Sequence, residues 1–101
     1  MTQYIIAPEA IQDLKIITDY LSQTNLETAE KLLNQFEKKC RYLVQFPKIG
    51  RSYRYIRPYL RGLPLNSYII FYRLSQDTIE IMRVVRGNRD LEALFNTDQK
   101  D

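Results

Sequence analysis

The sequence contains no histidine and no tryptophan among its 101 residues, and it has only one cysteine and three glycines. The absence of histidine excludes histidine catalysis and imidazole metal ligands, and it deprives any serine nucleophile of its usual base. The single Cys40 excludes an internal disulfide, and its place among helical apolar residues indicates a small core residue. One cysteine and scattered carboxylates form no metal-binding pattern, so we expect no metal and no cofactor.

The chain also lacks long apolar runs and the glycine-rich loops that bind nucleotides. No apolar segment approaches the roughly 20 residues of a membrane span, and residues 1–10 show no signal-peptide pattern. Neither GxxxxGK[ST] nor GxGxxG occurs. Together with the single cysteine, these absences favour a cytoplasmic protein. The length fits a single domain over residues 1–101, in which residues 96–101 form a polar, mobile tail.

The second half of the chain has an excess of arginine. Residues 1–50 contain six Lys or Arg and six Asp or Glu, whereas residues 51–101 contain nine and six, so the net charge of +3 arises there. Every basic residue from Arg51 to Arg89 is an arginine, opposed only by Asp77 and Glu80. Because the planar guanidinium suits phosphates and carboxylates, this region predicts a surface that binds nucleic acid or an acidic peptide. For any single arginine, a solvated ion pair is an equally good interpretation.

The segment from Leu65 to Asp90 predicts the centre of a sheet. Ser67 to Arg73 is almost continuously apolar or aromatic, which is typical of a strand covered on both faces. A polar break at residues 75–77 suits a hairpin loop, and Thr78 to Arg86 forms the second strand. Arg83 falls in phase with apolar residues of that strand, where a charge is costly unless it is paired or faces a groove. Those apolar residues are Ile79, Ile81 and Val85.

Two amphipathic helices are predicted before this hairpin. The first begins at Pro8 and the second is capped by Asn25 and stopped by Pro47. The apolar stripe of the first helix is Ile11, Leu14, Ile17 and Leu21, and that of the second is Ala29, Leu32, Leu33, Phe36, Cys40 and Leu43.

Shorter elements complete the predicted fold. Gln3 to Ile6 is β-prone and predicts an edge strand, Arg51 to Ile56 predicts a loop that passes into a strand, and Asp90 to Phe95 predicts a short helical turn. The resulting class is α+β, with an N-terminal strand and a helical hairpin packed on a mainly antiparallel sheet of about four strands. The C-terminal segment is helical and short. We expect the sheet face away from the helices to be partly open and to carry arginines.

Several segments carry a family pattern by their order and spacing. They are Ala10-x-x-Asp13-Leu14, Leu43-x-x-Phe46-Pro47-x-Ile49-Gly50-Arg51, Ile56-Arg57-Pro58, Tyr68 to Arg73, and Ile79 to Leu91 with its Gly87-Asn88-Arg89-Asp90-Leu91 ending. With this pattern the chain resembles the ParE branch of the RelE/ParE superfamily, the toxins of bacterial type II toxin–antitoxin modules. The resemblance covers nearly the whole chain.

The resemblance implies a toxin, associated with plasmid stabilisation, that forms a hetero-oligomer with a cognate antitoxin whose C-terminal segment wraps it. ParE members are associated with inhibition of DNA gyrase by protein contact, without enzymatic activity. On this interpretation the target or antitoxin contacts are Arg57, Arg61, Arg83, Arg86 and Arg89.

The alternative is a RelE-like endonuclease that cleaves messenger RNA on the ribosome. In that case Arg61 and Arg83 would hold the scissile phosphate and Tyr53 would assist. Two departures count against it: the strand region has no lysine, and Phe95 stands where a C-terminal tyrosine is expected in that branch. Because phenylalanine cannot transfer a proton, the resemblance favours gyrase inhibition.

Overall fold

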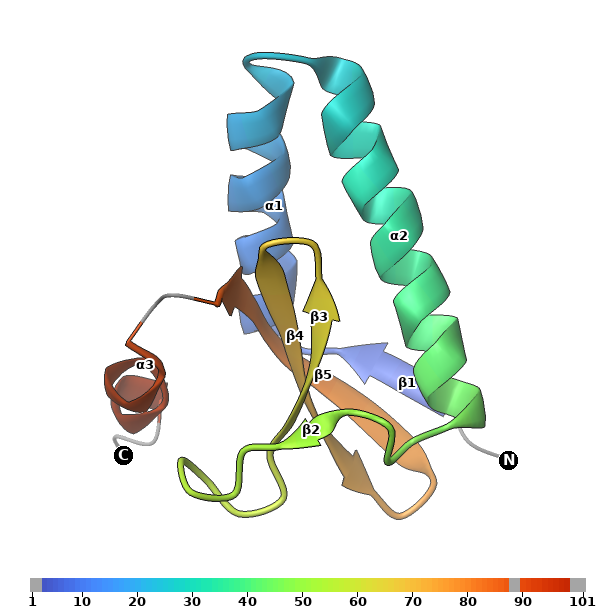
Figure 1. Ribbon diagram of the computed structural model, residues 1–101, viewed down its shortest axis with the longest axis vertical. Helices are drawn as coiled ribbons and strands as arrows, with labels where there is room; N and C mark the ends of the chain where they lie inside the picture. The colour runs from blue at the N-terminus through green and yellow to red at the C-terminus, as the bar shows by residue number, and fades with distance from the viewer. Residues whose placement is uncertain (1–2, 88–89, 99–101) are drawn as a thin grey trace.

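The protein folds into a helical hairpin packed on a five-stranded sheet, in a computed structural model that describes residues 3–87 and 90–98 (Figure 1). The strand order is β1-β5-β4-β3-β2, and only the β1–β5 pair is parallel. This confirms the predicted α+β class, with five strands where about four were expected. The elements are β1 Gln3–Ile6, α1 Pro8–Ser22, α2 Leu26–Gln45, β2 Arg51–Ser52, β3 Arg61–Leu65, β4 Tyr68–Ser75, β5 Thr78–Arg86 and α3 Leu91–Asp98.

The two long helices begin and end at the predicted signals. Pro8 occupies the first turn of α1, and the Asn25 side chain accepts a hydrogen bond of 2.9 Å from the Glu27 N–H at the start of α2. The predicted stripe of α1 was wrong at one position, since Ile11 is 56% exposed. The buried stripe is instead Ala10, Asp13, Leu14 and Ile17, which follows the i, i+3, i+4, i+7 spacing of a helix face. Leu33 of α2 is likewise exposed.

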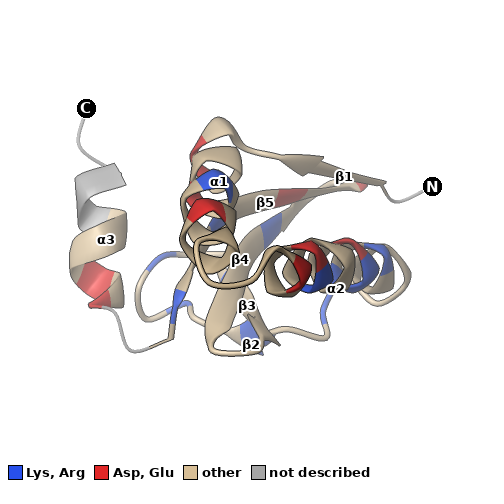
Figure 2. Ribbon diagram, turned by 90° about the horizontal axis from the view of Figure 1, so that it is seen from above, with Lys and Arg blue, Asp and Glu red and all other residues tan. Residues whose placement is uncertain are grey.

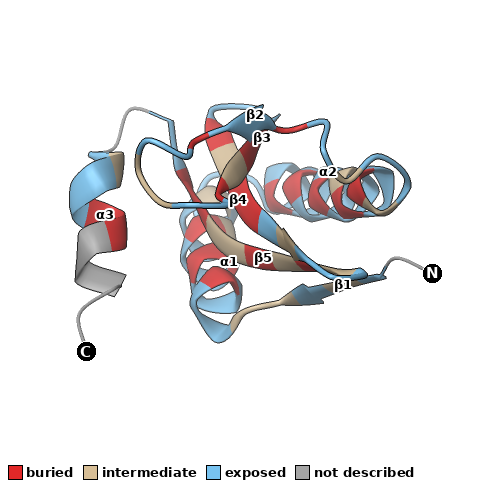
Figure 3. Cartoon of the chain, turned by 90° about the horizontal axis from the view of Figure 1, so that it is seen from below, coloured by how far each residue is buried: buried red, intermediate tan, exposed pale blue. Residues whose placement is uncertain are grey.

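The main core lies between the helices and one face of the sheet (Figure 3). Burial raises the pKa of the Cys40 thiol to about 12, and the side chain is fully buried, which confirms it as a core residue. The aromatic residues of β4 are core residues too, as their position in a central strand predicts. The residues that contribute most to this cluster are Leu14, Ile17, Leu32, Phe36, Cys40, Leu43, Ile70, Tyr72, Ile79 and Ile81.

The opposite face of the sheet carries a second buried cluster, so the expectation of a partly open face was wrong there. Phe71 of β4 makes edge-to-face contacts with Tyr53 and with Phe95 of α3, at ring centroid distances of 5.0 and 5.2 Å. The loop after β2 and α3 therefore cover this face, and Figure 1 shows α3 set apart from α1 and α2. Leu60, Val85 and Leu94 complete the cluster.

The segments around the sheet differ in detail from the predicted ones. The strand expected within residues 51–56 is only Arg51–Ser52 and comes before the loop, not after it. Pro64 lies inside β3, which is possible because β2 pairs only with Arg61 and Gly62 and leaves the rest of that edge unpaired. Helix α3 continues to Asp98, so residues 96–98 of the predicted tail are helical, and residues 99–101 lie outside the described residues.

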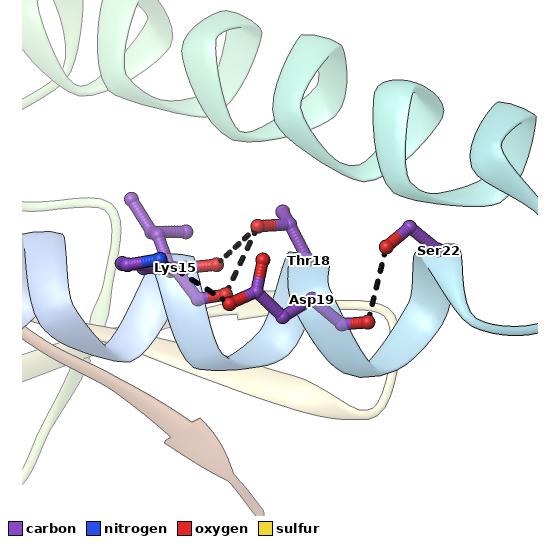
Figure 4. Close-up of polar contacts among 5 residues, drawn as sticks. Lys15, Thr18, Asp19 and Ser22 are labelled. Atoms are coloured by element: carbon purple, nitrogen blue, oxygen red, sulfur yellow. Dashed lines mark hydrogen bonds and ion pairs between the residues drawn. The ribbon is translucent and has the colours of Figure 1, made fainter.

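Figure 4 shows polar contacts that join residues within α1. Lys15 and Asp19 form an exposed ion pair of 3.4 Å, and Thr18 donates to the Leu14 carbonyl at 2.9 Å. An exposed i,i+4 pair contributes little stability. None of the helices within residues 3–87 and 90–98 is long and apolar enough to cross a membrane.

Candidate functional site

A β-bulge in β5 decides where Arg83 lies. Tyr72 pairs with Ile81 and Phe71 pairs with Arg83, so Met82 is the extra residue of the bulge. The bulge shifts the alternation, and Val85 consequently joins the second cluster while Ile79 and Ile81 belong to the main core. The prediction that Arg83, Ile79, Ile81 and Val85 all lie on one face of the strand was therefore wrong.

Arg83 is paired with a carboxylate of α1. Its Nε and Nη2 donate to the two Asp13 carboxylate oxygens at 2.8 and 3.0 Å, and the Val84 N–H donates to Asp13 Oδ2 at 2.9 Å. The two side chains are 14% and 10% exposed. Asp13 thus takes the place of a neighbouring strand at the point where β1 has ended, and it fixes the angle of α1 to the sheet.

Beyond this pair, an open groove of about 570 Å³ runs between α1 and β5. Its walls are mainly apolar, and Ile16 and Tyr20 expose large side chains along it. The cation at its end is Arg86, whose guanidinium carbon lies 5.5 Å from the centre of the Tyr68 ring. The residues that line this groove, called the α1–β5 groove below, are Asp13, Ile16, Ile17, Tyr20, Tyr68, Val84, Val85 and Arg86.

The groove follows a strand edge that β1 does not cover. β1 pairs with β5 only as far as Ile81. In the antiparallel β4–β5 ladder, every second residue of β5 forms its backbone hydrogen bonds with β4. The hydrogen bond from the Gly87 N–H to the Ser67 carbonyl shows which residues these are, so the backbone groups of Val84 and Arg86 face away from β4. Asp13 accepts the Val84 N–H, while the Val84 carbonyl and the Arg86 N–H face the groove. This edge can accept an extended chain.

Arg57 binds α3 to the rest of the molecule. Its Nη2 donates to the Phe95 carbonyl at 2.6 Å, and its guanidinium carbon lies 5.3 Å from the Phe95 ring centre. Arg57 also lines a small cavity of about 200 Å³ together with Arg83, Glu9 and Glu80. This contact holds α3 over the second cluster.

Arg61 and Tyr72 hold the connector between α2 and β2. Arg61 Nη1 donates to the Gly50 carbonyl at 2.8 Å and to the Lys48 carbonyl at 3.2 Å. The Tyr72 hydroxyl donates to the Pro47 carbonyl at 2.8 Å and accepts from the Gly50 N–H at 3.0 Å. Burial raises the pKa of the Tyr72 phenol above its ordinary value. Gly50 has no room for a side chain, since an added Cβ would lie 2.6 Å from the Tyr72 hydroxyl.

A second cavity, of about 460 Å³, lies beside this connector, and three basic side chains line it. Figure 2 shows basic and acidic positions interleaved along α2, whereas the charged positions of β2 and β3 are all basic. Among the described residues, three cations and no carboxylate line the cavity, which is called the basic cavity below. Its lining residues are Lys48, Ser52, Arg54, Pro58, Tyr59, Leu60, Arg61 and Leu74.

The structure distributes the predicted site residues over several places. Arg57 and Arg83 share the small cavity, Arg61 lines the basic cavity and Arg86 lines the α1–β5 groove. Tyr53 is buried in the second cluster with Phe95, and Arg89 lies outside the described residues. Across residues 3–87 and 90–98, no group of three His, Cys, Asp or Glu residues could hold a metal ion.

Sequence reasoning missed two sets of residues. Asp13 stands on the apolar stripe of α1, and a carboxylate at that position indicates a buried partner. Lys48, Arg54 and Tyr59 were not predicted to form one site, because a connector and a loop separated in sequence bring them to one cavity. The apolar spacing from Ile81 to Val84 also departs from strict alternation and indicates the bulge.

Comparison with known proteins gives one consistent result. The profile of the family described as "ParE toxin of type II toxin-antitoxin system, parDE" matches residues 4–91. Toxin ParE1 of Mycobacterium tuberculosis is 29% identical over 93 residues, which cover 90% of this chain and 95% of the relative. Toxin ParE3 of Caulobacter vibrioides is 28% identical over 79 residues, which cover 78% of this chain and 79% of the relative.

A solved structure shows the same fold. The chromosomal ParDE TA system from P. aeruginosa contains a chain that superposes with a TM-score of 0.70 at 26% sequence identity. The match covers 85% of this chain and 96% of that chain.

Proposed function

The chain belongs to the ParE family of toxins from type II toxin–antitoxin systems, and we propose that it inhibits DNA gyrase by protein contact and is neutralised by a cognate antitoxin. Family membership supports the toxin assignment, and the observation that carries the antitoxin proposal is the α1–β5 groove. A role in the cytoplasm, where gyrase acts, and in plasmid stabilisation belongs to the same proposal.

The groove suits an amphipathic, acidic antitoxin segment. Ile16 and Tyr20 offer apolar side chains along one wall, and Arg86 offers a positive charge at the end. The Val84 carbonyl and the Arg86 N–H can pair with the backbone of an extended segment laid along β5. An extended segment that alternates apolar and acidic residues would therefore pack on the apolar walls, hydrogen-bond to the strand edge and pair with the Arg86 guanidinium.

Gyrase inhibition is proposed as binding without chemistry. The three residues that the ribonuclease interpretation requires do not line one common cavity: Arg83 is paired with Asp13, and Arg61 lines the basic cavity. The Tyr53 ring is buried against Phe71. We propose that Arg86 and Arg89 contact gyrase or the antitoxin directly, together with the exposed part of Arg61. Arg57 and Arg83 contribute by holding α3 and α1 in place.

The test of the target is a gyrase supercoiling assay with purified, antitoxin-free protein, run beside an in vitro translation reaction probed for message cleavage. We expect loss of supercoiling with intact message. Supercoiling that persists at saturating toxin would refute gyrase inhibition, and cut message would establish the RelE-like alternative. Arg86→Gln and Arg89→Gln should weaken inhibition, while Arg41→Gln on the exposed side of α2 removes the same charge and serves as the control.

The test of the groove uses the protein encoded beside this chain as the antitoxin. Tyr20→Ala and Arg86→Gln should each weaken the complex about tenfold, since aromatic and arginine anchors dominate such interfaces. Arg54→Gln in the basic cavity is the charge-matched control. Moderate salt should reduce affinity only in part, because apolar burial is not screened. Complete loss of binding at moderate salt, or equal losses in the control, would contradict this site.

A further inference from the structure

The loop from Tyr53 to Leu60 is a fixed support for exposed side chains. A hydrogen bond of 2.8 Å from the Tyr53 N–H to the Leu60 carbonyl joins its ends, and the Ile56 N–H donates to the Tyr53 carbonyl at 2.9 Å. Tyr53 and Leu60 are themselves buried in the second cluster. The exposed residues between them, Arg54, Tyr55, Pro58 and Tyr59, are therefore presented to solvent from a closed loop of defined shape, as in many binding loops.

Tyr59 stands out within this loop. Its side chain is 81% exposed, the largest exposure among the large apolar and aromatic residues described, and its backbone has a φ of 68°. A tyrosine in the left-handed region has a conformational cost, and contacts of the surrounding structure must offset it. The fold thus keeps an aromatic ring in water at the rim of the basic cavity, in a strained conformation.

The cavity beside Tyr59 is strongly cationic. Lys48 comes from the connector, Arg54 from the loop and Arg61 from β3, and among the described residues no carboxylate lines the cavity. Arg61 is oriented by the Gly50 and Lys48 carbonyls, so its guanidinium does not have to be ordered when a ligand binds. The Ser52 hydroxyl adds a polar group on the same wall. The composition is that of an anion site with several donors.

We propose that the basic cavity binds a strand of nucleic acid, with backbone phosphates held by Lys48, Arg54 and Arg61 and an unpaired base stacked on Tyr59. Cationic grooves combined with exposed aromatic rings are the usual design of single-strand binding sites. The α1–β5 groove, by contrast, is mainly apolar and carries one arginine, which suits a peptide better. An acidic peptide could pair with the cations, but it offers no base to stack on the exposed Tyr59 ring.

The proposal for this site is binding, without cleavage. Among the described residues, no histidine, aspartate or glutamate lines the cavity to serve as a general acid or base. The site goes beyond gyrase inhibition and does not depend on it, since binding can be measured without gyrase. If gyrase is the target, the site would allow the toxin to hold a DNA strand together with the enzyme.

The experiment is fluorescence anisotropy with fluorescein-labelled 12-nucleotide dT and rU strands and the purified full chain at 50 mM salt. We expect binding of at least one strand, with an affinity that falls as salt rises. Tyr59→Ala should weaken it about fivefold or more, as expected for loss of one stacked base. Arg54→Gln should weaken binding and lower the slope of log K against log salt by about 0.7, the value for one phosphate contact on a single strand.

Two controls separate this site from general attraction to a positive protein. Tyr55 belongs to the same loop and is 64% exposed but does not line the cavity, so Tyr55→Ala should leave affinity within about twofold. Arg41→Gln removes one charge from α2 and should also have little effect. Equal losses in the controls, failure of both strands to bind, equally tight binding of polyglutamate, or cleavage of the rU strand would each overturn the proposal. Circular dichroism melts of every variant establish that the folded chain is compared.

Discussion

Replacing Asp13 with alanine should destabilise the whole domain, because one carboxylate satisfies three donors. Arg83 Nε and Nη2 and the Val84 N–H all donate to it within 3.0 Å, and both side chains of the pair are almost buried. The variant leaves the guanidinium without its carboxylate and a backbone N–H without its acceptor. It also removes the group that stands in for β1 beside the second half of β5.

The magnitude follows from these losses. Breaking a buried ion pair by removing one partner costs about 3–5 kcal/mol, and part of this is the orphaned backbone donor. Glu9 and Glu80 line the same small cavity as Arg83 and can supply some compensating charge, which favours the lower end of that range. A domain of this size has a total stability of about 5–15 kcal/mol. Asp13→Ala should therefore lower the melting temperature by about 12 °C or more.

The assay is urea unfolding followed by circular dichroism, with two companion variants. Asp13→Asn keeps an oxygen for the Val84 N–H and should cost less than Asp13→Ala. The double variant Asp13→Leu/Arg83→Met removes both charges and should be more stable than Asp13→Ala, because it leaves no uncompensated charge. A cost below about 1 kcal/mol for Asp13→Ala, or a double variant less stable than the single one, would refute the role assigned to this pair.

Three further predictions test other parts of the fold. Gly50→Ala should cost about 1–3 kcal/mol in urea unfolding because its Cβ would strike the Tyr72 ring, whereas Gly87→Ala, whose Cβ meets only ordinary contacts from 3.5 Å, should be nearly neutral; equal costs would contradict this. Cys40 should resist a thiol reagent at pH 8 in the folded state and react readily in denaturant. Burial raises the pKa of its thiol from the ordinary 9.0 to about 12, so the folded protein keeps the unreactive neutral thiol. Equal reaction rates in the two states would contradict its burial. Tyr59→Gly should be about 1 kcal/mol more stable than Tyr59→Ala, because glycine accepts a positive φ without strain; the reverse order would argue against strain.

The parts of the fold that follow from periodicity were predictable, and the parts that depend on a break in periodicity were not. The hairpin of β4 and β5 and the two helices carry regular apolar spacing with clear caps and stops, so their bounds agree closely with the predicted ones. Arg83 was misplaced because a single bulged residue, Met82, reverses the alternation after Ile81. Asp13 was missed as a core group because its partner lies 70 residues away in sequence.

The arginines divide by what already binds them, and this division bears on function. Arg57 and Arg83 use their guanidinium groups on Phe95 and Asp13, so substitutions there will act through the position of α3 and α1. Arg54 and Arg86 are exposed, and they lie at two different cavities. Loss of toxicity in an Arg83 variant would therefore not identify a contact unless its stability were measured too. The same loss in an Arg54 or Arg86 variant of unchanged stability would identify which surface acts, and the two would separate strand binding from protein binding.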